Sequence, residues 1–181
     1  MQNRSQNIKR VALTGLLFAL AMTLSFIEGM ITFPGLLPGM KLGLANVVVM
    51  YALCFMGFKQ ALLLDVLKAF FVFLVSGPTA GFLSFCGGTL SLLVMWVLYD
   101  VLPFHVTWFI LSVSGALAHN IGQLIGASVI LSTAVSLYYA PVMLILGLVM
   151  GGLTSISLKA ILPALEKLGL NTKKSKNNNN S

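Results

Sequence analysis

Long apolar runs alternate with short polar, glycine- or proline-containing segments along most of the chain. A helix needs about 17–25 mostly apolar residues to cross a bilayer, and six runs approach that length. The pattern therefore predicts six membrane-spanning helices with these approximate bounds: 8–27, 42–57, 60–75, 82–98, 106–131 and 139–158. Several runs are near the short end, which tilt of the helix or local thinning of the bilayer would accommodate.

Composition leads to the same class. The 181 residues are 58% hydrophobic and only 8% charged, and the mean hydropathy is +0.98. A soluble domain has about 25% charged residues, so too few remain here to cover a water-facing surface. We expect an all-α integral membrane protein built as one six-helix bundle. The expected divisions are a polar N-terminus (1–7), a membrane domain (8–160) and a basic, asparagine-rich tail (161–181) that is largely disordered.

The net charge of +7 is gathered next to the ends of apolar runs. Basic residues precede the first run (Arg4, Lys9 and Arg10), follow the last one (from Lys159 on) and separate the second from the third (Lys59). Cytoplasmic loops of membrane proteins carry an excess of such residues. Both termini are therefore expected in the cytoplasm, with segments 29–41, 76–81 and 132–138 outside. This distribution argues for a membrane surface and against nucleic acid as the partner of the positive charge.

Three hydrogen-bonding side chains lie in the middle of the fifth run: His119, Asn120 and Gln123. Helical spacing puts them on neighbouring parts of one face, together with small residues at positions 112, 115, 122 and 126. Polar groups in an apolar span are costly unless they are satisfied, and they often mark a binding site. They either line a ligand pocket or hold helices together by hydrogen bonds.

Segment 29–41 contains two proline–glycine breaks but stays apolar, so it is expected to fold back over the outer end of the bundle. It is either a connector on the membrane surface or a lid over a pocket. Lys41 and Asn46 follow it and can reach an anionic or carbonyl group of a ligand. Lys41 can equally extend to a lipid phosphate.

Charged and thiol side chains also lie within apolar runs. Asp65 and Lys68 have the i, i+3 spacing of an ion pair on one helix face, which would be structural or would couple protons or ions. Glu28 ends the first run as a solvated charge or a pocket residue. Cys54 and Cys86 are interpreted as buried free thiols.

Catalytic motifs are missing from the sequence. It contains no G-x-x-x-x-G-K-[ST] phosphate loop, no G-x-S-x-G elbow and no paired aspartates for magnesium. His119 has no second histidine or cysteine at metal-ligand spacing. We therefore expect neither an enzyme nor a bound metal or cofactor.

Small residues spaced by four recur in three runs: Gly15, Ala19 and Thr23 in the first, Gly122 and Gly126 in the fifth, Gly147 and Gly151 in the sixth. Such rows let helix backbones approach closely. They serve packing within the bundle or the docking of another membrane protein.

Three segments, 38–46, 118–123 and 138–141, give the chain a resemblance to a bacterial membrane family over residues 9–158. The family is labelled "heptaprenyl diphosphate synthase component I" or "Gx transporter". It is similar in turn to the substrate-binding S-components of energy-coupling factor transporters. Those proteins have six helices and cytoplasmic termini. They bind a vitamin-like solute near the outer face, and helix one docks onto a transmembrane coupling subunit that works with two ATPases.

The resemblance implies uptake of a small vitamin-like or precursor molecule across the bacterial cytoplasmic membrane. His119, Asn120 and Gln123 would line the pocket, and Lys41 and Asn46 would form its gate. The docking face on helix one would contain two small residues, Gly15 and Ala19, where the usual pattern is Ala-x-x-x-Ala.

Two other functions stay open. One is a non-catalytic membrane subunit in polyprenyl diphosphate or quinone synthesis, with a soluble prenyl synthase as its partner. The other is a membrane subunit of flavin-based extracellular electron transfer, with a redox partner. The sequence does not identify the substrate.

Overall fold

The computed structural model describes residues 2–30, 39–102, 106–131 and 133–167. In these ranges the chain is helical almost throughout and has no strands, which confirms the predicted all-α class. The elements are α1 (Gln2–Met30), α2 (Asn46–Met56), α3 (Phe58–Ser76), α4 (Pro78–Trp96), the π-helical turn η1 (Val97–Val101), α5 (Trp108–Ile130) and α6 (Thr133–Lys167).

Four helical segments in the described ranges are long and apolar enough to cross a membrane: Val11–Met30, Pro78–Val101, Trp108–Ile130 and Leu137–Lys159. The second predicted span, 42–57, is shorter than expected, because residues 42–45 are not helical and α2 has only 11 residues. At about 1.5 Å per residue, α2 is shorter than the bilayer core is thick. The six-helix fold is confirmed, but α2 lies inside the bundle as a short core helix.

The junctions differ from the predicted loops. Gly77 alone separates α3 from α4, because its φ of 91° turns the chain and Pro78 starts the next helix at once. The prediction of a loop over 76–81 was therefore wrong. The predicted loop 132–138 is also largely helical, since α6 begins at Thr133.

Helices also extend beyond the predicted membrane domain. Residues 2–7 belong to α1, so the polar N-terminus is helical in the structure, and α6 continues through residues 161–167. Polar residues next to an apolar run can belong to the same helix. Hydropathy marks only the apolar part, so it underestimates the length of the helix. The rest of the predicted tail, 168–181, and residues 31–38 of the predicted lid lie outside the described residues.

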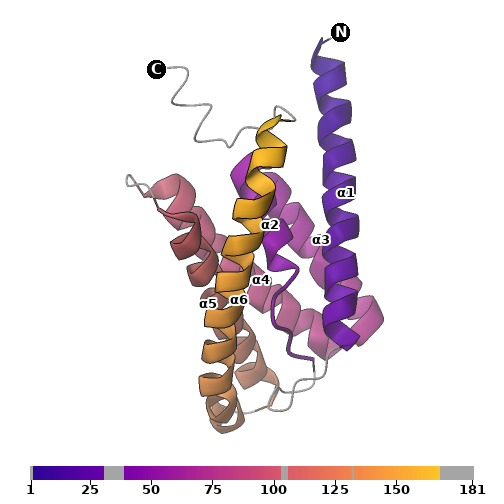
Figure 1. Cartoon of the computed structure of the whole chain (residues 1–181). Coiled ribbons are helices and arrows are strands. Elements are labelled where there is room, and N and C mark those ends of the chain that lie inside the picture. Colours follow the sequence, from indigo (N-terminus) through magenta and orange to yellow (C-terminus); the bar gives the residue numbers. More distant parts are fainter. Residues whose placement is uncertain (1, 31–38, 103–105, 132, 168–181) are drawn as a thin grey trace.

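Helix α2 is the centre of the bundle (Figure 1). It contacts α1, α3, α4, α5 and α6, and most of its side chains are buried. Helix α1 stands at one edge against α2 and α3, while α5 packs between α4 and α6. The beginning of α1 and the end of α6 lie at the same end of the bundle.

Two of the three rows of small residues pack helices together. A Cβ added at Gly122 would lie 2.6 Å from the Cys86 carbonyl oxygen of α4, and one at Gly151 would lie 2.6 Å from Val113 Cα of α5. Only glycine permits such close approach of the backbones. The row on α1 is different, because Gly15 and Ala19 are exposed and a Cβ at Gly15 would meet no atom within 4 Å.

Candidate functional site

Residues 39–45, which precede α2, approach α4 and α5 closely. Gly39 and Gly43 both have φ of 90°, a conformation that side chains other than glycine rarely adopt. A Cβ at Gly39 would lie 3.3 Å from Ala80 Cα, and one at Gly43 would lie 3.0 Å from Cδ2 of His119. The glycines thus let this segment, here called the entry segment (39–45), approach the polar residues of α5.

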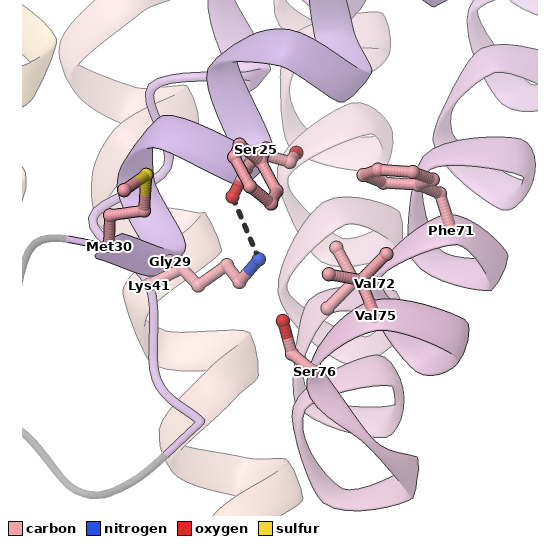
Figure 2. Close-up of a pocket in the computed structure, with 9 residues that line it drawn as sticks. Ser25, Gly29, Met30, Lys41, Phe71, Val72, Val75 and Ser76 are labelled. Atoms are coloured by element: carbon pink, nitrogen blue, oxygen red, sulfur yellow. Dashed lines mark hydrogen bonds between the residues drawn. The ribbon is translucent and has the colours of Figure 1, made fainter.

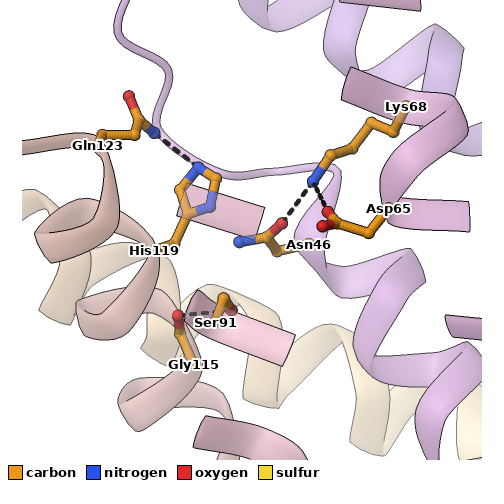
Figure 3. A network of polar contacts seen from close by, with 7 residues as sticks. All are labelled: Asn46, Asp65, Lys68, Ser91, Gly115, His119 and Gln123. Carbon is orange, nitrogen blue, oxygen red and sulfur yellow. Dashed lines mark hydrogen bonds and ion pairs between the residues drawn. The ribbon is translucent and has the colours of Figure 1, made fainter. Parts of the chain in front are cut away.

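The side-chain amide of Gln123 fixes the entry segment to α5. Its Oε1 accepts the backbone N–H of Lys41 at 2.9 Å, and its Nε2 donates to the carbonyl of the same residue at 2.7 Å. Nε2 also lies 2.6 Å from Nε2 of His119 (Figure 3). Because an amide nitrogen only donates, His119 accepts there and is neutral, with its proton on Nδ1.

Glu28 binds the same segment from α1. Its Oε1 accepts the backbone N–H groups of Gly43 and, at 3.4 Å, of Leu44. The Glu28 side chain is buried, so of the two interpretations left open by the sequence, the structure places it with the pocket residues. Helices α1 and α5, which are far apart in the chain, therefore hold the entry segment from opposite sides.

The predicted ion pair within the third run is confirmed. Lys68 Nζ lies 2.9 Å from Asp65 Oδ1 and donates to Asn46 Oδ1, also at 2.9 Å (Figure 3). Both partners are almost completely buried, with exposed side-chain fractions of 2% and 0%. The contact with Asn46 joins the pair to the start of α2, so these charges belong to the same cluster as the entry segment.

The ammonium of Lys41 lies on the α1 side of the cluster, where Nζ donates to the carbonyl of Ser25 at 3.1 Å. Burial lowers the pKa of this ammonium, and the nearby carboxylate of Glu28 acts in the opposite direction. Within the described ranges no carboxylate lies within ion-pair distance of Lys41, since the ion pair found there joins Lys68 to Asp65.

These side chains surround a small cavity of about 10 Å³. It is lined by Ser25, Glu28, Lys41, Gly43, Ala45, Asn46, Lys68, Ser84 and His119. A volume of this order is close to the smallest that holds one water molecule. A larger molecule therefore requires the entry segment to move away from α1 and α5.

Several polar atoms of this group are buried without a hydrogen-bond partner among the described residues, including Asn46 Nδ2 and His119 Nδ1. Leaving a buried donor unpaired costs about 1–3 kcal/mol. Because Asn46 lines the cavity, its Nδ2 donor is available to an acceptor group that enters it.

The structure brings four of the five predicted pocket residues together: Lys41, Asn46, His119 and Gln123. Asn120 faces α6 instead, where its Nδ2 donates to the carbonyl of Met143. In the structure, Asn120 links α5 to α6 by a hydrogen bond. Helix packing of this kind was the alternative to a pocket role in the sequence analysis.

Two charged side chains were predicted as an ion pair but not as part of this site: Asp65 and Lys68. For Glu28, the sequence left both a solvated charge and a pocket residue open. The sequence signal was their position, because a charge in an apolar run is more costly than an amide there and marks a functional site more strongly. Glu28 and Asp65 are also two of only four acidic residues in the chain.

The chain is similar to two groups of known proteins. The profile of the family described as "Heptaprenyl diphosphate synthase component I" matches residues 17–161. A solved structure titled "Structure and mechanism of the S component of a bacterial ECF transporter" is 22% identical, with a TM-score of 0.63, and the alignment covers 93% of this chain and 98% of that one. No curated protein sequence matches. The similarity shows that the bundle has the fold of that S component.

Proposed function

The chain belongs to the heptaprenyl diphosphate synthase component I family, and on this premise we propose that it is the solute-binding membrane subunit of an energy-coupling factor type uptake transporter. The observation that carries the proposal is the convergence of polar groups on one small cavity inside an S-component fold. These groups come from α1, the entry segment, α2, α3, α4 and α5, so the cavity is a property of the whole bundle.

The cavity offers both signs of charge and both kinds of hydrogen-bonding group. Lys41 and Lys68 supply ammonium groups, Glu28 supplies a carboxylate, and Asn46 supplies the unpaired amide donor. Such a set suits a small polar molecule with its own acceptors, such as a vitamin or a metabolic precursor. His119 forms the wall on α5, and Gln123 holds its imidazole through a hydrogen bond.

The entry segment is the gate of the proposed site. Gln123 and Glu28 bind its backbone through four hydrogen bonds, and Lys41 Nζ donates a fifth to the Ser25 carbonyl. Opening the segment breaks these bonds and leaves the helices intact. Asn46, the first residue of α2, and Lys41 then become available to the solute. A lid was one of the two interpretations of segment 29–41, and we propose it for residues 39–41 only.

The proposed subunit has no catalytic role and depends on a partner. Its sequence holds no nucleotide-binding loop, so ATP hydrolysis is assigned to ATPases that act through a transmembrane coupling subunit. We assign the docking of that subunit to Gly15 and Ala19, which are exposed on α1.

Purification from native membranes in mild detergent tests the proposal. Mass spectrometry of the purified sample should find one small polar molecule and the coupling subunit. An Asn46→Ala or His119→Ala variant should lose the small molecule, whereas Ser128→Ala, whose hydroxyl bonds only to Leu124 of its own helix, should keep it. Wild-type protein that carries neither a solute nor the coupling subunit would exclude the proposal.

The family description favours a second candidate, a non-catalytic membrane subunit that associates with a soluble polyprenyl diphosphate synthase. The chain itself has no aspartate-rich metal site for prenyl transfer, so the synthase would supply the chemistry. Co-purification of a synthase without a solute would support this candidate over the transporter subunit.

A further inference from the structure

A second, larger cavity lies between α1 and α3 (Figure 2). It is adjacent to the polar cluster, the group of side chains that line the small cavity described above. Its volume is about 310 Å³. Lys41 and Ser25 line both cavities, so they form the partition between them. The other described lining residues come from the two helices: Phe26, Gly29 and Met30 of α1, and Phe71, Val72, Val75 and Ser76 of α3.

The polar end of this cavity is built from an ammonium and a hydroxyl. A Cβ added at Gly29 would lie 3.8 Å from Lys41 Nζ and 3.9 Å from Ser76 Oγ, so the two groups converge over the bare backbone of Gly29. Lys41 is 8% exposed, and its Nζ makes one hydrogen bond, to the Ser25 carbonyl. An ammonium has three N–H donors, so two of them remain for another acceptor.

The charge at this end fits an anion. No carboxylate in the described part of the chain lies within ion-pair distance of Lys41, as noted above. The last turns of α1 and α3 also end here, and the carbonyl ends of helices repel anions. An anionic group therefore binds here only because of the Lys41 ammonium. Replacing Lys41 is then a direct test of anion binding at this end of the cavity.

The walls of the cavity are apolar and continue onto the outer surface of the bundle. Phe26, Met30 and Val75 line it and are also 50%, 72% and 51% exposed. Its polar end lies at the ends of α1 and α3, the depth at which the lipid headgroup region begins for a helix that crosses the bilayer. The cavity thus presents its charge at headgroup depth and its apolar walls along the acyl chains.

We propose that this cavity binds one anionic phospholipid, with the phosphate between Lys41 Nζ and Ser76 Oγ and an acyl chain along the walls formed by α1 and α3. The lipid is separate from the transported solute, which belongs to the cavity on the other side of Lys41. A bound phosphate would accept a hydrogen bond from Lys41 Nζ and would hold α1 next to α3.

Native mass spectrometry of the purified protein in mixed micelles tests this site. Dioleoyl phosphatidylglycerol and dioleoyl phosphatidylcholine are supplied at equal mole fraction, and the lipid retained per protein is counted. Wild-type protein should retain one phosphatidylglycerol at least tenfold in preference to phosphatidylcholine. Lys41→Gln should abolish the preference, and Gly29→Leu should abolish it by filling the space between the ammonium and the hydroxyl.

Gly152→Leu is the matched control, because a Cβ at Gly152 meets no atom within 4 Å, and it should keep the preference. Thermal unfolding identifies any variant that does not fold. If Lys41→Gln does not fold, the lipid preference of Gly29→Leu is the result that tests the proposal. Equal retention of the two lipids by wild-type protein, or an unchanged preference in folded Gly29→Leu, would overturn the proposal. Release of phosphatidylglycerol by millimolar inorganic phosphate would also overturn it, since the apolar walls would then contribute nothing.

Discussion

At the scale of single residues, neighbouring polar side chains on one helix have different tasks. Gln123 is fully buried and uses both ends of its amide on the backbone of Lys41, 82 positions earlier in the chain. Asn120, three positions before it, bonds to α6 instead. The sequence placed both on one polar face, but only their partners show that Gln123 holds the entry segment and Asn120 holds a helix.

Replacing Gln123 by Ala should destabilise the protein by about 1–3 kcal/mol, because the N–H and the carbonyl of Lys41 would lose their buried partners. Thermal unfolding in detergent would measure the loss, and hydrogen exchange should increase specifically in the entry segment. Ser128→Ala on the same helix removes only a local bond to Leu124 and should change little. Equal melting temperatures for the two variants would contradict the role of Gln123.

The buried pair of Lys68 and Asp65 gives a second prediction at this scale. Lys68→Met leaves a carboxylate buried without its partner and should cost about 3–5 kcal/mol. Adding Asp65→Asn removes that charge, so the double variant should be more stable than Lys68→Met alone. A double-mutant cycle by denaturant unfolding measures the coupling, and simple additivity of the two changes would show that the pair is not coupled.

At the scale of elements, rows of small residues that look alike in the sequence have different environments. The rows on α5 and α6 are filled by neighbouring helices, whereas Gly15 and Ala19 of α1 face outward. Spacing by four identifies a smooth helix face, but it does not say whether the bundle or another protein covers that face.

Two adjacent glycines of α6 provide a matched pair. Gly151→Ala would place a Cβ 2.6 Å from Val113 Cα and should lower stability by at least 1 kcal/mol, because α5 and α6 must move apart. Gly152→Ala meets open space and should be neutral or stabilising by up to about 1 kcal/mol through helix propensity. Melting temperatures of the two variants in detergent provide the comparison, and a lower value for Gly152→Ala would refute the packing described here.

The exposed face of α1 leads to a prediction about the proposed partner. Ala19→Trp should prevent co-purification of the coupling subunit while leaving the melting temperature and solute binding unchanged, because the side chain points away from the bundle. Ile145→Trp, at an exposed position of α6, should leave co-purification intact. If both variants keep the partner, docking does not use this part of α1.

At the scale of the whole molecule, the beginning of α1 and the end of α6 meet at one end of the bundle (Figure 1). This arrangement agrees with an even number of crossings. The positive charges of the sequence predict that this end is cytoplasmic. The larger cavity is lined by the last turns of α1 and α3 at the opposite end, so in this topology it would face the outside.

Cysteine labelling can test this orientation in a variant whose Cys54 and Cys86 are replaced by Ala. A membrane-impermeant maleimide should label Tyr138→Cys, near the start of α6, in intact cells. Lys159→Cys, near the other end of α6, should react only after the membrane is permeabilised. The reverse result would invert the predicted topology.

The sequence by itself determined the class, the helix number and the buried stripe of α5. The free energy of transferring apolar side chains out of water is nearly additive over the residues. Composition and periodicity therefore predict which segments are buried without knowledge of the fold. Loop lengths were overestimated because polar and small residues such as Thr79 and Gly81 continue a helix that Pro78 has started.

Only the tertiary structure decided which polar groups meet. Glu28 reaches Gly43, Asn46 reaches Lys68 and Lys41 reaches Gln123 across separations of 15, 22 and 82 residues. Periodicity places each side chain on a face of its own helix, but the neighbour that this face meets depends on how the other five helices pack around α2. The polar cluster and the lipid cavity beside it are therefore products of that packing, and no local stretch of sequence specifies either one.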